Sequence, residues 1–212
     1  MTDRRAVRET YDRIAEHFAR TRAYAWPEVE AFVEASPEAG TALDLACGNG
    51  RHAGLLARRA DRVVGLDASR AILGTARERA ANEGFSLDLL QGDAAALPLR
   101  EDSVDLAVYV AALHHLPTPT LRRASLDDLA RVLAPAGRAL VSVWSVTHSA
   151  FDEREGFDTT VDWTLPDGTT VGRYYHVYDP EEFEAAVEAS ALDVERVYES
   201  EGNCYAVGTG TE

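Results

Sequence analysis

The chain has 212 residues, and 46% of them are apolar, which is enough to bury one sizeable core, so we expect a single domain over residues 1–212. Its two cysteines are too few for a disulfide framework, no N-terminal segment resembles a signal peptide, and no apolar run approaches the roughly 20 residues that cross a bilayer. These features exclude a disulfide-rich secreted protein and a membrane-spanning one, and they predict a cytoplasmic protein.

All 21 basic residues are arginine, and 36 acidic residues bring the net charge to −15. An acidic surface keeps a protein soluble when the Debye length has shrunk to about 3 Å at 1 M salt, so the charge indicates a halophile and need not describe the substrate. The charge is uneven, since residues 1–26 carry six arginines and four acids. This N-terminal segment could bind an anion.

The first elements in chain order are helical. Apolar residues recur at helical spacing from Val7 to Phe18, which predicts a helix over residues 4–19, and Pro27 is a favoured first residue for a second, short helix. Strands then alternate with helices: strand 41–45, helix 51–60, strand 62–66, helix 69–82 closed by Gly84, strands 86–90 and 104–110, helix 120–133 stopped by Pro135-Ala136-Gly137, and strand 138–144. This alternation predicts an α/β fold with a mostly parallel sheet and helices on both faces.

The remaining third of the chain has a different pattern. Residues 146–160 are polar and patternless, after which residues 161–165 and 169–175 flank Pro166-Asp167-Gly168 as a predicted hairpin. Asp179 and Pro180 start a helix to about residue 190, and strands follow at 192–199 and 203–208. We therefore divide the chain into an N-terminal helical cap (1–36), a cofactor-binding core (41–145), a substrate-side insertion (146–178) and a C-terminal helix with a strand pair (179–208).

The loop from Asp44 to Gly50 ends the first core strand with a carboxylate and turns through two glycines. Glycines let the backbone approach a ligand closely, and the next helix would point its amides at the loop. The same letters fit a dinucleotide fingerprint, and they also fit a tight turn without a ligand. However, a carboxylate here would repel a pyrophosphate, whereas it suits the ammonium and sulfonium of S-adenosylmethionine.

Acids also follow the next two strands. Asp67 ends the second strand, where an open α/β fold places the carboxylate that accepts from ribose hydroxyls. Asp93 follows the third strand, where a carboxylate can accept from an adenine amino group. Each acid alone could cap a turn or helix, but three acids after three successive strands favour a nucleotide site.

With these motifs, residues 41–145 resemble the class I S-adenosylmethionine-dependent methyltransferases. The resemblance implies a Rossmann-like seven-stranded sheet of order 3-2-1-4-5-7-6. That family usually has glycine where this chain has Ala46. The cofactor-binding residues that the resemblance implies are Tyr11, Asp44, Ala46, Cys47, Gly48, Asn49, Gly50, Asp67, Ala68, Asp93, Ala94 and Ala111.

Sequence motifs outside this core point to a more specific family. Five motifs together resemble those of the tRNA wobble-uridine methyltransferases. They are Tyr11-Asp12-x-Ile14-Ala15-x-His17-Phe18-x-x-Thr21-Arg22-x-x-x-Trp26-Pro27, Ala112-Leu113-His114-His115-Leu116, Val143-Trp144, Arg173-Tyr174-Tyr175-His176 and Asn203-x-Tyr205. That resemblance implies esterification of 5-carboxymethyluridine in the tRNA anticodon loop. It also implies a small zinc-binding activator protein docked beside the third strand, residues 86–90.

The acceptor chemistry constrains which side chains matter. A carboxylate with a pKa near 4 is ionised at neutral pH, so methyl transfer to it needs no general base, only orientation and a dry site. Arginine or histidine donors and aromatic walls suit this task. We expect catalytic roles for Arg22, His115, Trp144, Arg173 and Tyr175, and substrate contacts from Trp26, His176 and Asn203.

Other assignments stay open at this point. The aromatic residues could be core residues and the arginines surface charges, because spacing alone does not separate these roles. The histidines show no metal-ligand spacing with the cysteines, so we expect no metal. A methyltransferase acting on a small metabolite and a catalytically silent cofactor-binding protein remain alternatives.

Overall fold

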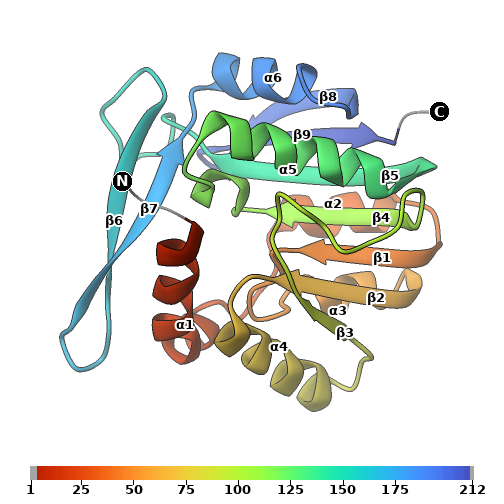
Figure 1. The fold of residues 1–212 in the computed structure, drawn as a ribbon, viewed down its shortest axis with the longest axis horizontal. Helices are drawn as coiled ribbons and strands as arrows, with labels where there is room; N and C mark the ends of the chain where they lie inside the picture. The colour runs from red at the N-terminus through yellow and green to blue at the C-terminus, as the bar shows by residue number, and fades with distance from the viewer. Residues whose placement is uncertain (1–3, 211–212) are drawn as a thin grey trace.

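A computed structural model describes residues 4–210, and its centre is a seven-stranded sheet of order β3-β2-β1-β4-β5-β9-β8 (Figure 1). The strands are β1 (Ala39–Leu45), β2 (Ala60–Asp67), β3 (Asp88–Gln91), β4 (Val104–Val110), β5 (Leu133–Trp144), β8 (Asp193–Ser200) and β9 (Asn203–Thr209). β1 to β5 run parallel, and β9 is antiparallel to both of its neighbours. The predicted fold class and strand order are confirmed, with the last two predicted strands appearing as β8 and β9.

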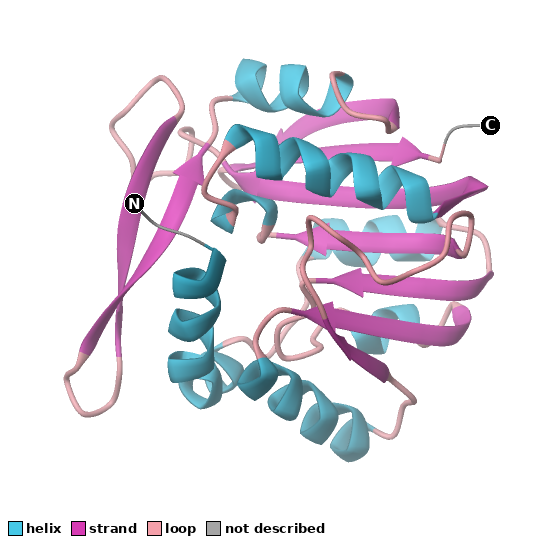
Figure 2. Ribbon diagram, in the orientation of Figure 1, coloured by secondary structure: helices cyan, strands magenta, loops and turns pink. Residues whose placement is uncertain are grey.

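Helices cover both faces of the sheet (Figure 2). They are α1 (Arg4–Thr21), α2 (Pro27–Ala35), α3 (Ala53–Leu56), α4 (Arg70–Glu83), the short 3-10 helix η1 (Leu113–His115), α5 (Pro119–Val132) and α6 (Pro180–Glu188). α2 and α3 pack on one face through their buried residues, whereas α5 and α6 pack on the other. Within residues 4–210, no helix has the length and apolar character that a bilayer crossing requires.

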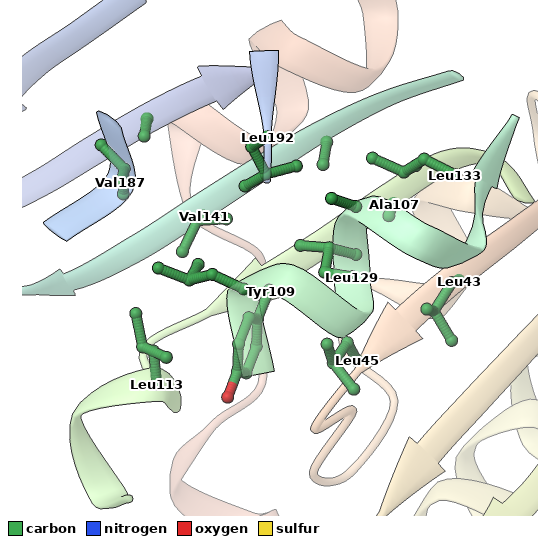
Figure 3. Close-up of a cluster of buried hydrophobic side chains, with 14 of the residues drawn as sticks. Leu43, Leu45, Ala107, Tyr109, Leu113, Leu129, Leu133, Val141, Val187 and Leu192 are labelled. Atoms are coloured by element: carbon green, nitrogen blue, oxygen red, sulfur yellow. The ribbon is translucent and has the colours of Figure 1, made fainter. Parts of the chain in front are cut away.

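The larger core cluster lies between the sheet and the α5–α6 face (Figure 3). Leu129 of α5 and Val187 of α6 face Leu43, Ala107 and Val141 on the central strands, and all five are fully or almost fully buried. Burying a side chain of this size is worth about 1.5–3 kcal/mol. This packing fixes the central strands, and therefore the positions of the loops that follow them.

The strands β6 (Phe157–Thr164) and β7 (Thr170–Val177) form a separate two-stranded antiparallel hairpin. It stands to one side of the main sheet, with α1 between the two (Figure 1). Ile14 of α1 packs against Trp163 and Val171 of the hairpin. The predicted hairpin is confirmed, but it is longer than expected because β6 already begins at Phe157, within the stretch predicted to be patternless.

Several predicted element ends are also confirmed. The Ser69 hydroxyl accepts from the backbone N–H of Ile72 at the start of α4, and Gly84 ends that helix with a φ of 77°. Asp179 caps α6 in the same way, accepting from Glu182 N at 3.0 Å. These ends are readable from sequence because the capping side chain and its partner are only three residues apart.

Two other predictions were wrong. The helix expected at 51–60 is only the four residues of α3, because the loop after β1 continues to His52 and β2 begins at Ala60, two residues earlier than expected. Pro135-Ala136-Gly137 does not separate α5 from β5: the helix ends at Val132, and the triplet lies inside β5 where its register against β4 shifts. A strand bulge and a helix stop use the same residue types, so sequence did not separate them.

Candidate functional site

A cavity of about 760 Å³ lies at the carboxyl ends of the parallel strands. One wall is formed by the segments that follow β1, β2, β3 and β4, and by Trp144 at the end of β5. α1 and Arg173 and Tyr175 of β7 line the cavity as well. Open α/β sheets bind ligands at this edge, because the strands end there and the helix N-termini face it.

The loop after β1 turns through left-handed backbone. Gly48 and Gly50 have φ values of 54° and 72°, and Ala46 adopts the same conformation with a φ of 55°. A Cβ atom built on Gly48 would lie 3.5 Å from the Phe18 ring. Gly48 and Phe18 both line the cavity. Ala46 therefore holds, at a steric cost of about 1–2 kcal/mol, the backbone that glycine adopts freely.

Asp44, the last acid of β1, lies beneath this loop and does not reach the cavity wall. It is 2% exposed, and its Oδ2 atom has no hydrogen-bond partner within the described part of the chain. Burial raises the pKa of this carboxyl, and the nearby Arg51 guanidinium opposes the rise. A buried carboxyl oxygen without a partner is costly, and a cationic group bound beside it would relieve that cost.

Asp67 and Asp93 both line the cavity. The Asp67 carboxylate accepts from the backbone N–H groups of Gly48 at 3.0 Å and Ser69 at 2.8 Å, which joins the two loops. Burial nevertheless raises the pKa of Asp67 to about 6. Asp93 forms an ion pair with Arg4, so α1 contacts the acid that follows β3.

The side chains of Asp12, Asn49 and Tyr11 also hold α1 in place across the cavity. Asp12 accepts from the Ser69 hydroxyl at 2.6 Å and from Ala71 N at 3.0 Å, at the start of α4. Asn49 donates from the first core loop to the carbonyl of Ala19 at 3.1 Å. Tyr11 Oη lies 2.7 Å from His115 Nε2. The helix therefore belongs to the site as much as the strand ends do.

Arg173 is the most unusual charged residue of the cavity. It is 6% exposed, and its Nη1 donates to the Tyr175 hydroxyl at 2.7 Å. Its Nε–H is buried without a partner, and no carboxylate among residues 4–210 forms an ion pair with it. A buried cation is ordinarily paired. Arg173 thus offers unused donors to an anion in the cavity.

Arg22 lies near Arg173 and also lines the cavity. Its guanidinium carbon is 5.3 Å from the Trp163 ring and 5.6 Å from the Phe18 ring, and the Arg173 guanidinium carbon is 4.7 Å from the same Trp163 ring. Like Arg173, Arg22 forms no ion pair in the described structure. This end of the cavity is therefore cationic.

The paired histidines do not provide a free base. His115 Nδ1 faces the Tyr174 carbonyl at 2.8 Å, so it carries the proton, and Nε2 then accepts from the Tyr11 hydroxyl. Burial lowers the pKa of His115 to about 4, which keeps the ring neutral. His114 is buried, and its Nδ1 accepts from Trp144 N at 3.1 Å, so the neutral ring carries its proton on Nε2, which has no partner among the described residues.

Aromatic rings make up much of the remaining acceptor side. Trp144 stacks on Tyr175 with ring centroids 4.7 Å apart, and also on His148 at 5.5 Å. The Arg51 guanidinium lies 5.2 Å from the Trp26 ring. Burial, reinforced by the charge of Arg22, lowers the pKa of Arg51 to about 10.

Comparison with known proteins agrees with this site. Residues 42–137 match the family model of a methyltransferase domain. A protein from Encephalitozoon cuniculi that carries a provisional methyltransferase name is 31% identical over 186 residues, covering 84% of this chain and 83% of its own. The chain belongs to the class I S-adenosylmethionine-dependent methyltransferases.

This methyltransferase also resembles enzymes with a narrower name. The tRNA (carboxymethyluridine(34)-5-O)-methyltransferase of Arabidopsis thaliana is 34% identical over 162 residues, which cover 76% of this chain and 37% of the plant protein. The mouse ALKBH8 enzyme of the same name is also 34% identical, and the chain spans 20% of its length.

Solved structures support the same fold. A DhpI protein, solved as a complex with SAH, has a TM-score of 0.73 at 22% identity and covers 98% of this chain and 96% of its own. The protein bound to the Trm112 methyltransferase activator in a Haloferax volcanii complex has a TM-score of 0.73 at 19% identity, covering 97% and 98%.

S-adenosylmethionine is the methyl donor of this methyltransferase family, and the residues present fit it. The unpaired Oδ2 of Asp44 and the backbone of Gly48 on the cavity wall suit a cationic group held against the loop. Asp67 would hold the ribose hydroxyls and Asp93 the adenine amino group, while Ala94 and Ala111 line the wall. When bound, the cofactor supplies a methyl group activated by a sulfonium.

Most of the predicted site residues lie on the cavity wall. Ten of the twelve predicted cofactor residues line it, all except Asp44 and Gly50. The five predicted catalytic residues and Trp26 line it too. These placements bring together residues from both ends of the chain.

His176 and Asn203, predicted to contact substrate, do not line the cavity. His176 lies between Asp158 Oδ1 at 2.7 Å and Glu182 Oε1 at 2.8 Å, joining the hairpin to α6. Asn203 is buried at the start of β9 and donates to the Glu201 carbonyl. Alternation along β7 explains the first difference, since Arg173 and Tyr175 face the cavity and His176, between Tyr175 and Val177, faces the other way.

Sequence reasoning missed other residues of the site. Arg51 and His52 line the cavity directly after the glycine loop, and the buried His52 leaves its Nε2 unpartnered. Their position beside the loop could have identified them. No sequence pattern could have identified Trp163. It lies in the hairpin, and the His17 ring that accepts its N–H is 146 residues away in the chain.

Proposed function

We propose that this methyltransferase esterifies the carboxylate of 5-carboxymethyluridine at the wobble position of tRNA. The observation that carries the proposal is the unpaired buried Arg173, whose Nε–H has no partner and whose side chain lines the cavity beside Arg22. Guanidinium groups bind carboxylates through paired charge-assisted hydrogen bonds. An acceptor with a carboxylate would supply the charge that this part of the site lacks.

His115, whose ring lies beside Tyr175 on the acceptor side, is not available as a base, which supports a carboxylate acceptor. Both ring nitrogens of His115 are engaged, and burial raises the pKa of Tyr11 and of Tyr175. An amine or hydroxyl acceptor would need a group to take its proton, whereas a carboxylate at neutral pH has already lost it. The chain's own residues then orient the carboxylate and exclude water.

A uridine rather than a small metabolite is favoured by the aromatic walls and by the relatives. Trp26, Trp144 and Tyr175 line a cavity large enough for a base beside the cofactor. Enzymes that act on a base take it out of its stack and hold it in such a pocket. Relatives named for the carboxymethyluridine 34 reaction are 34% identical to this chain.

We further propose that a methyltransferase activator docks along β3. This four-residue strand is the edge of the main sheet, and its inner leucines, Leu89 and Leu90, are only partly buried. An open edge with apolar side chains favours a covering partner. The complex from Haloferax volcanii is the precedent for such a pair.

The test uses the full chain, with and without an activator, and cofactor labelled in its methyl group. The acceptor is an anticodon stem-loop that carries 5-carboxymethyluridine, and the control is the same RNA with unmodified uridine. We expect base-labile label in the nucleoside of the first RNA only. Label that enters only small molecules from a cell extract would refute the RNA substrate, and failure to bind cofactor by calorimetry would indicate a silent protein.

A further inference from the structure

We propose that Trp163 is a positioning residue that holds Arg22 and Arg173 together as one carboxylate-binding pair. This inference rests on the proposed function. Trp163 lies on β6, is 8% exposed and is not part of the cavity wall. Any effect that it has on the substrate is therefore indirect, through the cavity residues that it contacts, namely Arg22, Arg173 and Phe18.

The geometry brings both cations onto one ring. The Arg173 guanidinium carbon lies 4.7 Å from the centre of the Trp163 ring, and that of Arg22 lies 5.3 Å from it. Tryptophan has the ring face that attracts a cation most strongly. Because Arg22 follows α1 and Arg173 belongs to β7, the indole contacts a residue from each of these two segments at the cationic end of the cavity.

Electrostatics explain why such a group is needed. Two like charges in a partly desolvated site repel each other, and no acidic side chain in residues 4–210 pairs with either arginine. A neighbouring carboxylate would relieve the repulsion, but it would also compete with a substrate carboxylate. An aromatic face attracts both cations and leaves their N–H donors available.

His17 fixes the orientation of the Trp163 ring. Trp163 Nε1–H donates to His17 Nδ1 at 3.0 Å, and the two rings meet edge to face with centroids 5.5 Å apart. His17 lies on α1, the same helix that carries Tyr11 over the cavity. The hydrogen bond fixes the plane of the indole and therefore the places where the guanidinium groups can lie.

The experiment measures charge discrimination, which a purely structural role for Trp163 would not change. Two anticodon stem-loops are compared, one with 5-carboxymethyluridine and one with its neutral isostere 5-carbamoylmethyluridine, and their dissociation constants are measured with SAH present. The wild-type protein should prefer the carboxylate. Trp163→Leu should lower this preference by about tenfold, whereas Trp163→Phe should keep most of it.

Controls separate the possible failures. Phe157→Leu, an aromatic-to-aliphatic change on the same strand outside the cavity, should keep the wild-type preference, and SAH affinity should stay unchanged in every variant. A wild-type preference that survives Trp163→Leu would overturn the inference. No preference in the wild type would instead overturn the carboxylate substrate. If Trp163→Leu failed to bind SAH, His17→Phe would replace it, and an unchanged preference in that variant would also overturn the inference.

Discussion

Replacing Arg173 with methionine should separate the stability of this protein from its activity. Arg173 is buried and carries a charge that no described carboxylate neutralises. Methionine keeps an unbranched apolar chain in the same space and removes only the guanidinium. We expect the fold to tolerate this change and the carboxylate substrate to lose its main contact.

The magnitude follows from the contacts of Arg173. The variant loses a charged hydrogen bond to Tyr175, worth about 1.5–3 kcal/mol, and two ring contacts of about 0.5–2 kcal/mol each. It also removes the desolvation of a buried cation, which costs several kcal/mol. These contributions nearly cancel, so the free energy of unfolding should stay within about 2 kcal/mol of wild type. Loss of a buried charge pair with substrate should lower kcat/KM by at least about 100-fold.

Urea unfolding and methylation kinetics on the modified stem-loop provide the two measurements. Arg122→Met is the matched control, because Arg122 is also buried and also lies over a tyrosine ring, but outside the cavity. Its kcat/KM should remain near wild type. The reasoning would be refuted if Arg173→Met kept full activity, or if its lost activity were accompanied by a loss of stability of more than about 4 kcal/mol.

Three further predictions follow from the site. Tyr11→Phe removes the hydroxyl that joins α1 to His115, and kcat/KM should fall by about 5- to 30-fold while circular dichroism stays unchanged. Asp44→Asn removes the charge of a buried carboxyl whose Oδ2 has no partner among the described residues, so calorimetry should show SAH binding weakened by at least about tenfold without loss of stability; unaltered affinity would assign Asp44 a purely structural role. His115 has a pKa of about 4 in the folded protein against 6.5 unfolded, so the unfolded state binds more protons and stability falls as pH drops from about 6.5 towards 4. Between pH 7 and pH 5, His115→Asn should therefore lose about 1–2 kcal/mol less stability than wild type in urea titrations, and equal losses would contradict a neutral buried ring.

The cofactor side of the site was predictable from sequence because it depends on short segments. A strand, the acid at its end and the glycine turn are neighbours in the chain, and parallel strands bring their carboxyl ends to one edge of the sheet. Asp67 and Asp93 line the cavity for this reason. Asp44 shows the limit of the same reasoning. Its place before the glycine turn was predictable, but sequence did not show that its side chain is buried outside the cavity wall.

The acceptor side was only partly predictable. Arg22, Arg173 and Tyr175 were identified through a family resemblance, and spacing alone would have left them as surface charges and a core ring. His176 was misassigned because the alternation along β7 decides which side chains face the cavity. Trp163 was missed because its role depends on contacts with His17 of α1, with Arg22 after that helix and with Arg173 of the hairpin.

Sequence by itself therefore determined the order of elements, the helix caps and the loops that hold a nucleotide-like cofactor, because each depends on residues within one or two turns of chain. Only the tertiary structure decided what the cofactor's methyl group would face. Tyr11 meets His115 across 104 residues and His17 meets Trp163 across 146. Such contacts depend on how α1 and the β6–β7 hairpin pack beside the sheet, and no local pattern of residues encodes that packing.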